Sequence, residues 1–330
     1  MSPLSWQNSL WPFSCRLDRN IATPADDAVL RQSFVSSRAR GNRILTNHIE
    51  LVMSKRHDPL PDGASPTSSR PHRLPKKQLE LFRDVLPILE KRNIPLAVSG
   101  TYALQMHTGI CRATKDLDIF LRAEEASVAL ACLVKHGFEC EVRDPVWLAK
   151  VYRDRYFVDL ITGMSNAVIT VDASWIKHSR PANVLGIDTR LLAPEELLVS
   201  KLFVTRRERF DGADIAHIIY ATRGELDWDR ILQHVGEHWE ILLWALLLFR
   251  YVYPRQSDFV PVSLWQDLIG RLKEAVSHPD PKQTFRGSLI DDRMFAIDLK
   301  EWGLDNVLQR KRAAREPMIA IAKESDCISA

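Results

Sequence analysis

The feature that most constrains this chain is a short apolar segment that leads into a glycine and is followed by a segment of alternating character. Residues 96–99 predict a buried strand, and residues 101–107 predict a helix that opens at Gly100 and is closed by Gly109. Residues 114–121 alternate between polar and apolar side chains, which predicts a second strand. This order of strand, turn, helix and strand indicates an α+β fold.

Two carboxylates share one face of the second strand. Residues two apart on a strand point the same way, so Asp116 and Asp118 lie on one face and Lys115, Leu117 and Ile119 on the other. Neighbouring anions raise each other's pKa unless a cation lies between them. Because carboxylate oxygens bind hard divalent cations, we expect this pair to hold Mg²⁺ or Mn²⁺.

The turn at Gly100-Thr101 suits a phosphate group. A helix N-terminus offers backbone N–H donors and a favourable dipole, and the Thr101 hydroxyl adds one more donor. Arg112, in the loop before the second strand, either steadies a triphosphate or pairs with a surface carboxylate. A phosphate site beside metal-binding carboxylates indicates phosphoryl or nucleotidyl transfer.

These motifs resemble the DNA polymerase β-type nucleotidyltransferase superfamily, in which Gly followed by Gly or Ser precedes a short helix and an Asp-x-Asp strand. The resemblance is specific over Gly100-Thr101 and over Asp116 and Asp118, and it covers residues 75–254. It implies a nucleotidyltransferase that takes an NTP, with the Gly100-Thr101 turn cradling the β- and γ-phosphates.

The resemblance also implies a third carboxylate on a neighbouring strand. Asp159, within residues 156–161, is the best match, and Asp172 is the second. In two-metal nucleotidyl transfer, Asp159 would bind the ion that activates the attacking hydroxyl, or would act as its base.

Bacterial stand-alone nucleotidyltransferase-like proteins, including those used as abortive-infection toxins, are similar in a further respect. They carry a Lys and an Arg on a helix after the sheet, followed by an Asp. Lys201, either Arg206 or Arg209, and Asp214 match these places. The resemblance implies that Lys201 and one arginine, with Arg209 as our choice, neutralise charge on the triphosphate.

Three segments are expected along the chain. Residues 1–74 mix Ser, Arg, Pro and Asp with little apolar periodicity, which predicts a largely disordered extension. Residues 75–193 predict the catalytic domain, a small mixed sheet with helices on one side, and residues 194–330 predict a helical module, with the nucleotide in the cleft between the two. Further strands are expected over residues 139–143, 156–161 and 167–171, and helices over residues 79–89, 126–135, 195–204, 213–221, 227–235, 240–252 and 263–276.

Composition limits which cellular compartment and which binding partners we expect. The net charge of +3 is too small to argue for nucleic acid, so RNA is a possible acceptor that is not favoured. Five scattered cysteines without a CxxC pair are typical of a reducing compartment. No secretory signal is visible, and the apolar run at residues 241–249 is shorter than the ~20 residues that cross a bilayer. We therefore expect a cytoplasmic protein that does not enter a membrane.

Three functions remain open at this point. The first is a metal-dependent transferase that moves an NMP onto an unknown small-molecule, protein or RNA acceptor and releases pyrophosphate. The second is a non-catalytic nucleotide- or partner-binding module on the same fold. Thr101 supports it, because Thr stands where Gly or Ser is usual and its branched Cβ tolerates a positive φ poorly. The third is a Mn²⁺-dependent glycosyltransferase that uses the same Asp-x-Asp pair.

Overall fold

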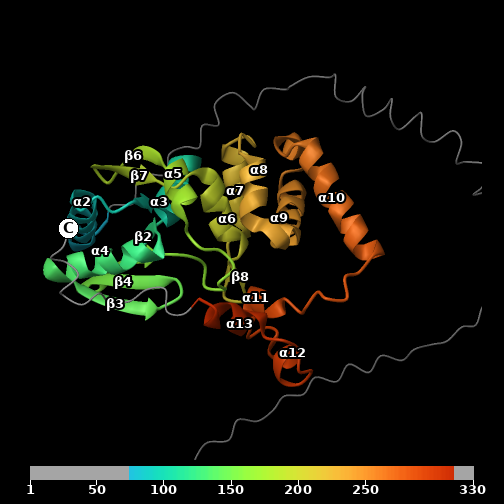
Figure 1. The fold of residues 1–330 in the computed structure, drawn as a ribbon. Helices are drawn as coiled ribbons and strands as arrows, with labels where there is room; N and C mark the ends of the chain where they lie inside the picture. The colour runs from blue at the N-terminus through green and yellow to red at the C-terminus, as the bar shows by residue number, and fades with distance from the viewer. Residues whose placement is uncertain (1–73, 316–330) are drawn as a thin grey trace, which may run out of the picture. The chain divides into compact units, whose positions relative to one another are not determined.

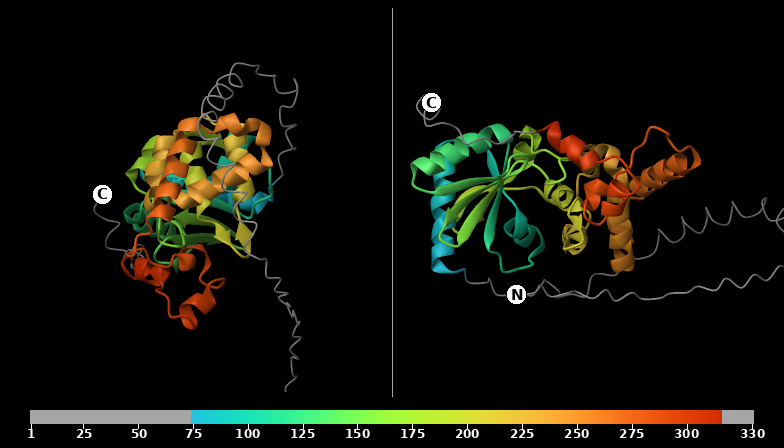
Figure 2. Two further views of the ribbon diagram at one scale, coloured as in Figure 1. Left: turned by 90° about the vertical axis from the view of Figure 1, so that its right-hand side faces the viewer. Right: turned by 90° about the horizontal axis from the view of Figure 1, so that it is seen from below.

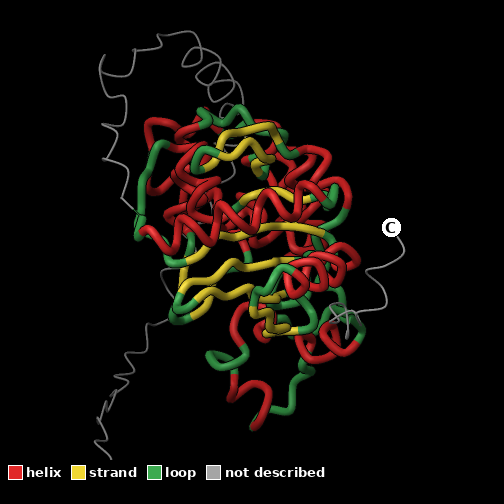
Figure 3. The backbone as a smooth tube through the Cα atoms, turned by 90° about the vertical axis from the view of Figure 1, so that its left-hand side faces the viewer, coloured by secondary structure: helices red, strands yellow, loops and turns green. Residues whose placement is uncertain are grey.

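A computed structural model describes residues 74–315 of the chain (Figure 1). The predicted extension over residues 1–74 lies outside the described residues except for Leu74. Seven strands form one sheet, in the order β3-β4-β5-β2-β1-β7-β6. Figure 3 shows these strands side by side in yellow. In chain order they are β1 (Leu96–Val98), β2 (Asp116–Leu121), β3 (Glu139–Asp144), β4 (Leu148–Arg153), β5 (Tyr156–Ile161), β6 (Arg180–Val184) and β7 (Ile187–Leu191).

The sheet is mixed, as its strand directions show. β2 runs parallel to β5 and antiparallel to β1, while β1 runs parallel to β7. The hairpins β3–β4, β4–β5 and β6–β7 are antiparallel and complete the two edges. The centre of the sheet is therefore β5-β2-β1, and it carries both motifs identified in the sequence.

Two helices cover one face of the sheet. α2 (Lys76–Lys91) is amphipathic and buries Leu81, Phe82 and Leu86 completely. It packs against α4 (Ala123–Lys135) and against β5 and β7. Figure 2 (right) shows α2 and α4 on the side of the sheet away from α3 (Gly100–Thr108). The opposite face, on which α3 lies, carries the aspartates of β2 and β5.

Helices dominate after β7. α3 packs against both α6 and α7, which fastens the glycine turn to this helical part. One short helix, α5 (Ala173–His178), precedes β6. After β7 the helices are α6 (Pro194–Leu202), α7 (Gly212–Ala221), α8 (Trp228–Val235), η1 (Gly236–His238), α9 (Trp239–Val252), η2 (Pro254–Phe259) and α10 (Val262–Ser277). A two-stranded ribbon of β8 (Thr205–Arg206) and β9 (Arg209–Phe210) lies between α6 and α7.

A buried charge network joins α6 to α8. Arg230 lies 2.6 Å from Glu195 and 3.0 Å from Glu196, and both carboxylates are buried. His234 Nε2 lies 3.2 Å from Glu196 Oε1. These contacts pair both buried carboxylates and link the two helices.

The last described segment returns to the sheet. It contains α11 (Gly287–Asp291), α12 (Ala296–Lys300) and α13 (Val307–Ala313), with α11 and α13 close to β8 in Figure 1. Leu289, Val307 and Leu308 form a small buried cluster against Val168. Residues 121 to 140 positions apart in sequence are thereby brought together.

The structure confirms the α+β fold and corrects part of its detail. The strand expected over residues 167–171 is wrong: the loop makes a single bridge, from Gly163 to Thr170, because Ala167 takes a positive φ and turns the chain. β4, β6, β7 and α5 were not predicted, nor were β8, β9 and α11 to α13. The division of the chain at Ala193 stays a prediction. Within residues 74–315, no helix is long and apolar enough to span a membrane.

Candidate active site

Three aspartates from two neighbouring strands meet on one face of the sheet. Asp116 and Asp118 alternate along β2, and Asp159 on β5 is the parallel register partner of Asp118. One ligand oxygen from each lies within 4.8 Å of the other two. Asp159 is buried, the other two are half-buried, and all three line the same cavity.

The turn at Gly100 lies against the carboxylate of Asp118. Gly100 follows β1 with a φ of 57°, a left-handed conformation that glycine adopts without strain. A Cβ atom here would lie 1.7 Å from Asp118 Oδ2, so a larger residue fits only if that carboxylate moves. The Ser99 N–H donates to the Asp118 carbonyl over 2.9 Å. Turn and carboxylate strand are therefore in direct contact.

The positive φ falls on Gly100 and not on Thr101. Thr101 lies in the first turn of α3, so its branched Cβ causes none of the strain considered from the sequence. Ser99, the residue before α3, also lines the cavity, and its buried hydroxyl has no hydrogen-bond partner within residues 74–315. Sequence reasoning missed Ser99, although its place directly before the glycine was an available signal.

A lysine that sequence reasoning also missed holds the third aspartate. Lys150 on β4 is the antiparallel register partner of Asp159, and its Nζ lies 2.6 Å from Asp159 Oδ1. The same Nζ lies 3.7 Å from the centroid of the Phe157 ring. Both side chains of the ion pair are largely buried, so the charge-assisted hydrogen bond orients the carboxylate.

Cationic side chains from α6 and its surroundings complete the site. Lys201 is buried, and its Nζ lies 3.0 Å from Asp211 and 2.7 Å from Asp214. Arg209 lies 3.1 Å from Asp211, and Arg112 pairs with Asp214. The partner of Arg112 is thus a buried carboxylate, not one on the surface.

The turn, the aspartates and these cations enclose one cavity of about 480 Å³. This volume lies in the range of small-molecule sites. Arg206 and Trp147 also line it. All eight residues that sequence reasoning chose for the site line this cavity: Gly100, Thr101, Arg112, Asp116, Asp118, Asp159, Lys201 and Arg209.

The electrostatics of the aspartates favour a bound cation. Removal from solvent, together with the charges of Asp116 and Asp159, raises the pKa of Asp118 to about 7, although Lys201 and Arg209 act in the opposite direction. Burial also raises the pKa of Asp159, while Lys150 lowers it. A cation among these oxygens would relieve the repulsion that raises both values.

The donor set fits a divalent metal ion. All three candidate ligands are carboxylates, the oxygen donors that Mg²⁺ and Mn²⁺ bind. Lys150 engages Oδ1 of Asp159, which leaves Oδ2 for a ligand bond. Asp116 Oδ1 accepts from the Thr114 hydroxyl over 2.5 Å, which fixes the orientation of this carboxylate.

The structure also shows where Asp172, the second candidate for the third carboxylate, and Lys115 lie. Asp172 lies outside the cavity, where it caps α5 by accepting from the N–H groups of Ser174 and Trp175. It is therefore no candidate for the third carboxylate. Lys115 is exposed and does not line the cavity, in agreement with its predicted orientation.

Part of the chain matches a known protein family. Residues 78–241 match the family described as "Nucleotidyl transferase of unknown function (DUF2204)". No curated protein matches the chain.

Several solved structures are similar to the chain in fold. A complex of ANT(2'')-Ia with adenylyl-2''-tobramycin has 14% sequence identity and a TM-score of 0.34, covering 54% of this chain and 99% of that one. An antigenic nucleotidyltransferase-like protein from Paracoccidioides brasiliensis has 20% identity and a TM-score of 0.38, covering 56% and 93%. The lincosamide antibiotic adenylyltransferase LnuA has 15% identity and a TM-score of 0.31, covering 44% and 96%.

The family match contains every part of the cavity that carries chemistry. The glycine turn, the three aspartates, Lys150, Lys201 and Arg209 all fall within residues 78–241. The residues that form the cavity therefore match a family of nucleotidyl transferases.

Proposed function

We propose that the protein transfers an NMP from an NTP onto an acceptor hydroxyl and releases pyrophosphate, with Mg²⁺ or Mn²⁺ bound to Asp116, Asp118 and Asp159. The observation that carries this proposal is the meeting of the three carboxylates within 4.8 Å of one another, beside the Gly100 turn. Nucleotidyl transfer requires carboxylates that can hold a metal ion and, next to them, a helix N-terminus that can bind phosphate.

Each side chain has a role in this proposal. The metal, when bound, supplies Lewis-acid polarisation of the α-phosphate and offsets charge that develops on it. Gly100 and Thr101 bind the β- and γ-phosphates through backbone N–H groups and the Thr101 hydroxyl. Lys201 and Arg209 neutralise charge on the triphosphate, and Arg112 holds Asp214 in place.

The reaction balances within this set of residues. The acceptor oxygen forms a bond to the α-phosphorus, and the bond from that phosphorus to the bridging oxygen breaks, so pyrophosphate leaves with the electron pair. Asp159 either binds the ion that would activate the acceptor hydroxyl, whose proton then passes to solvent, or acts as the base that accepts this proton. Lys150 keeps this carboxylate aimed while the proton moves.

The wider assignments belong to the same proposal. Residues 75–193 are proposed as the catalytic domain and residues 194–330 as the helical module, of which residues 316–330 lie outside the described part of the chain. The protein acts in the cytoplasm, consistent with its scattered cysteines.

The test is label transfer. The full chain is incubated with each of four α-³²P-labelled NTPs, Mg²⁺ or Mn²⁺ and cell extract, and products are separated into protein, RNA and small-molecule fractions. Label in one fraction is expected with the wild type. Asp116→Asn is expected to lose at least a hundredfold, because it removes a charge that would hold the metal.

Asp172→Asn is the matched control, since Asp172 caps α5 outside the cavity. Equal transfer by wild type and a folded Asp116→Asn variant would refute the assignment. Absence of label, with nucleotide binding retained, would favour the non-catalytic module. Stronger thermal protection by a UDP-sugar than by any NTP would favour the glycosyltransferase.

A further inference from the structure

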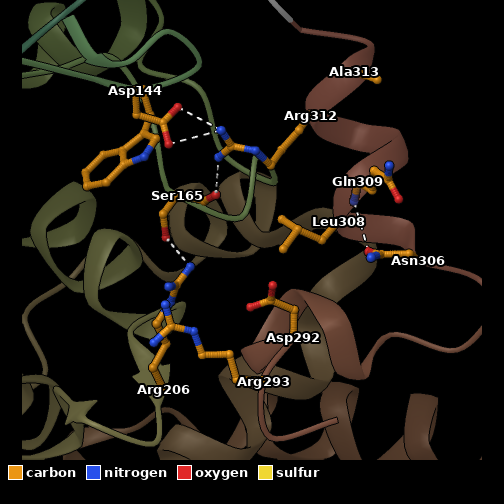
Figure 4. Close-up of a pocket in the computed structure, with 11 residues that line it drawn as sticks. Asp144, Ser165, Arg206, Asp292, Arg293, Asn306, Leu308, Gln309, Arg312 and Ala313 are labelled. Carbon is orange, nitrogen blue, oxygen red and sulfur yellow. Dashed lines mark hydrogen bonds and ion pairs between the residues drawn. The ribbon is translucent and has the colours of Figure 1, made fainter. Parts of the chain in front are cut away.

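A second cavity of about 630 Å³ adjoins the first (Figure 4). The first, of about 480 Å³, is the proposed NTP site and is called the nucleotide cavity below. Trp147, Ser165 and Arg206 line both cavities, so the two share a wall. The rest of the lining comes from the end of β3 and from the C-terminal segment: Asp144, Asp292, Arg293, Asn306, Leu308, Gln309, Arg312 and Ala313.

The C-terminal segment that forms this cavity is firmly attached to the catalytic part. The Arg207 N–H donates to Asp291 over 3.0 Å, and the Asn166 amide donates to the Leu289 carbonyl over 3.2 Å. Arg315 donates to the Val168 carbonyl over 3.3 Å. Residues 242–315 lie beyond the family match, and they supply part of the lining of this cavity.

One wall of the cavity is electrically neutral. Arg312 Nη2 donates to both carboxylate oxygens of Asp144, over 2.9 and 3.0 Å, and Nη1 donates to the Ser165 carbonyl over 3.1 Å. Figure 4 shows this bidentate pair at the edge of the cavity. It ties α13 to the sheet and leaves neither charge for a ligand.

The other wall carries two arginines that have no close carboxylate partner within the described residues. Half-buried Arg206 donates to the Ser165 hydroxyl over 3.1 Å, and no carboxylate within residues 74–315 forms an ion pair with it. The nearby Asp291 carboxylate is occupied by three backbone N–H groups. Arg293 has a long, exposed contact of 3.7 Å with Glu208, which contributes little.

We propose that this second cavity is the acceptor site, and that it takes a small hydroxylated molecule bearing one anionic group. The inference rests on the proposed function, since it names the acceptor class of the same transferase. The anion, a phosphate or a carboxylate, pairs with Arg206 and Arg293. Asp292, which forms no ion pair within the described residues, accepts a hydroxyl hydrogen bond. The shared wall places the acceptor hydroxyl beside the nucleotide.

The size and charge of the cavity decide against other acceptors. About 630 Å³ is the volume of a small-molecule site rather than an extended nucleic-acid groove. The lining holds three arginines against two aspartates, so a polycationic aminosugar meets net repulsion.

The experiment uses four probes that share a sugar framework: glucose, glucose 6-phosphate, glucuronate and glucosamine. Their affinities for the full chain are measured by ligand-observed NMR, with the nucleotide cavity occupied by Mg²⁺ and a non-hydrolysable NTP. Glucose 6-phosphate or glucuronate is expected to bind about tenfold more tightly than glucose, because charge-assisted hydrogen bonds are stronger. Which of the two binds better tells phosphate from carboxylate.

Variants locate the binding. Arg293→Gln, exposed and outside the nucleotide cavity, is expected to weaken the anionic probe about threefold and leave glucose unchanged. Arg271→Gln, on the exposed face of α10, is the matched control and is expected to change neither. Arg209→Gln is expected to weaken the NTP but not the probe.

The proposal would be overturned if all four probes bound with equal affinity, if none bound, or if glucosamine bound most tightly. It would also be overturned if Arg209→Gln weakened binding of the anionic probe as much as Arg293→Gln does. Because probe binding is measured without turnover, its outcome is independent of the label-transfer assay. A protein that transfers label but binds no anionic probe would contradict only the acceptor site. A protein that binds the anionic probe but transfers no label would hold an anion site without the acceptor role. Label recovered in the RNA fraction would also contradict the acceptor class.

Discussion

Asp118 on β2 and Asp159 on β5 are direct register partners in a parallel strand pair, and their carboxylates face the same cavity. They come from positions 41 residues apart, and the register alone brings them together. A shift of either strand by one residue would turn its carboxylate toward the helices that cover the other face. The site therefore depends on strand pairing as much as on the residues themselves.

Gly100→Ala is expected to abolish transfer. The added Cβ would lie 1.7 Å from Asp118 Oδ2, and the left-handed φ adds strain of about 1–2 kcal/mol. Transfer assays and urea unfolding check this. Gly137→Ala is the matched control, because its φ of 83° gives the same kind of strain and no atom lies within 4 Å of the new Cβ. Equal activity of the two variants would show that Gly100 and Asp118 are not in contact.

Lys150→Met is expected to lower stability and transfer together, because it leaves the buried Asp159 carboxylate without its cation. Saturating Mg²⁺ should restore much of the stability by taking over the role of the ammonium group. Thermal melts with EDTA and with Mg²⁺ measure the two states. Lys115→Met, at an exposed position, is expected to change neither. A Lys150→Met variant as stable as wild type in EDTA would argue against the ion pair.

Metal-free stability is expected to fall as pH rises toward 7. The folded-state pKa of Asp118, about 7, lies above its ordinary value of 3.8. The folded protein therefore binds more protons between these values, so the stabilising contribution present at about pH 4 is lost by about pH 7. Above pH 7 in EDTA, Asp118→Asn should be more stable than wild type, with an upper bound of about 4 kcal/mol.

Mg²⁺ should reverse this order, because it binds the ionised carboxylate and stabilises wild type but not the variant. Melting temperatures across pH 4–9, with and without Mg²⁺, measure both effects. A wild-type melting temperature that rises between pH 4 and 7 in EDTA while that of Asp118→Asn stays level would contradict the raised pKa.

Lys201→Met is expected to cost about 3 kcal/mol and to weaken NTP binding, since Asp211 and Asp214 then lose a shared buried cation. Adding Asp214→Asn to this variant should restore part of the stability and none of the nucleotide affinity. Urea unfolding and nucleotide titration separate the two effects. Lys177→Met on the exposed side of α5 serves as the control. Unchanged NTP affinity in folded Lys201→Met would remove Lys201 from the site.

Local patterns alone predicted the central elements of the fold. The glycine after an apolar run predicted the turn into α3, and alternation predicted β2 with both aspartates on one face. The loop at residues 167–171 misled the same reasoning, because its apolar residues are buried without forming a strand. β4 was missed, and Lys150 with it, since no local pattern marked the hairpin that makes Lys150 the register partner of Asp159.

Local sequence patterns account for the turn at Gly100, the shared face of Asp116 and Asp118, and the α+β class, because each depends on neighbours within a few positions. Long-range packing sets which carboxylates pair with Lys150 and Lys201, and how the C-terminal segment forms the second cavity. These depend on strand register and on contacts between residues more than 100 positions apart, such as Asp144 and Arg312. Periodicity specifies which face of an element is buried, but not which other element covers it.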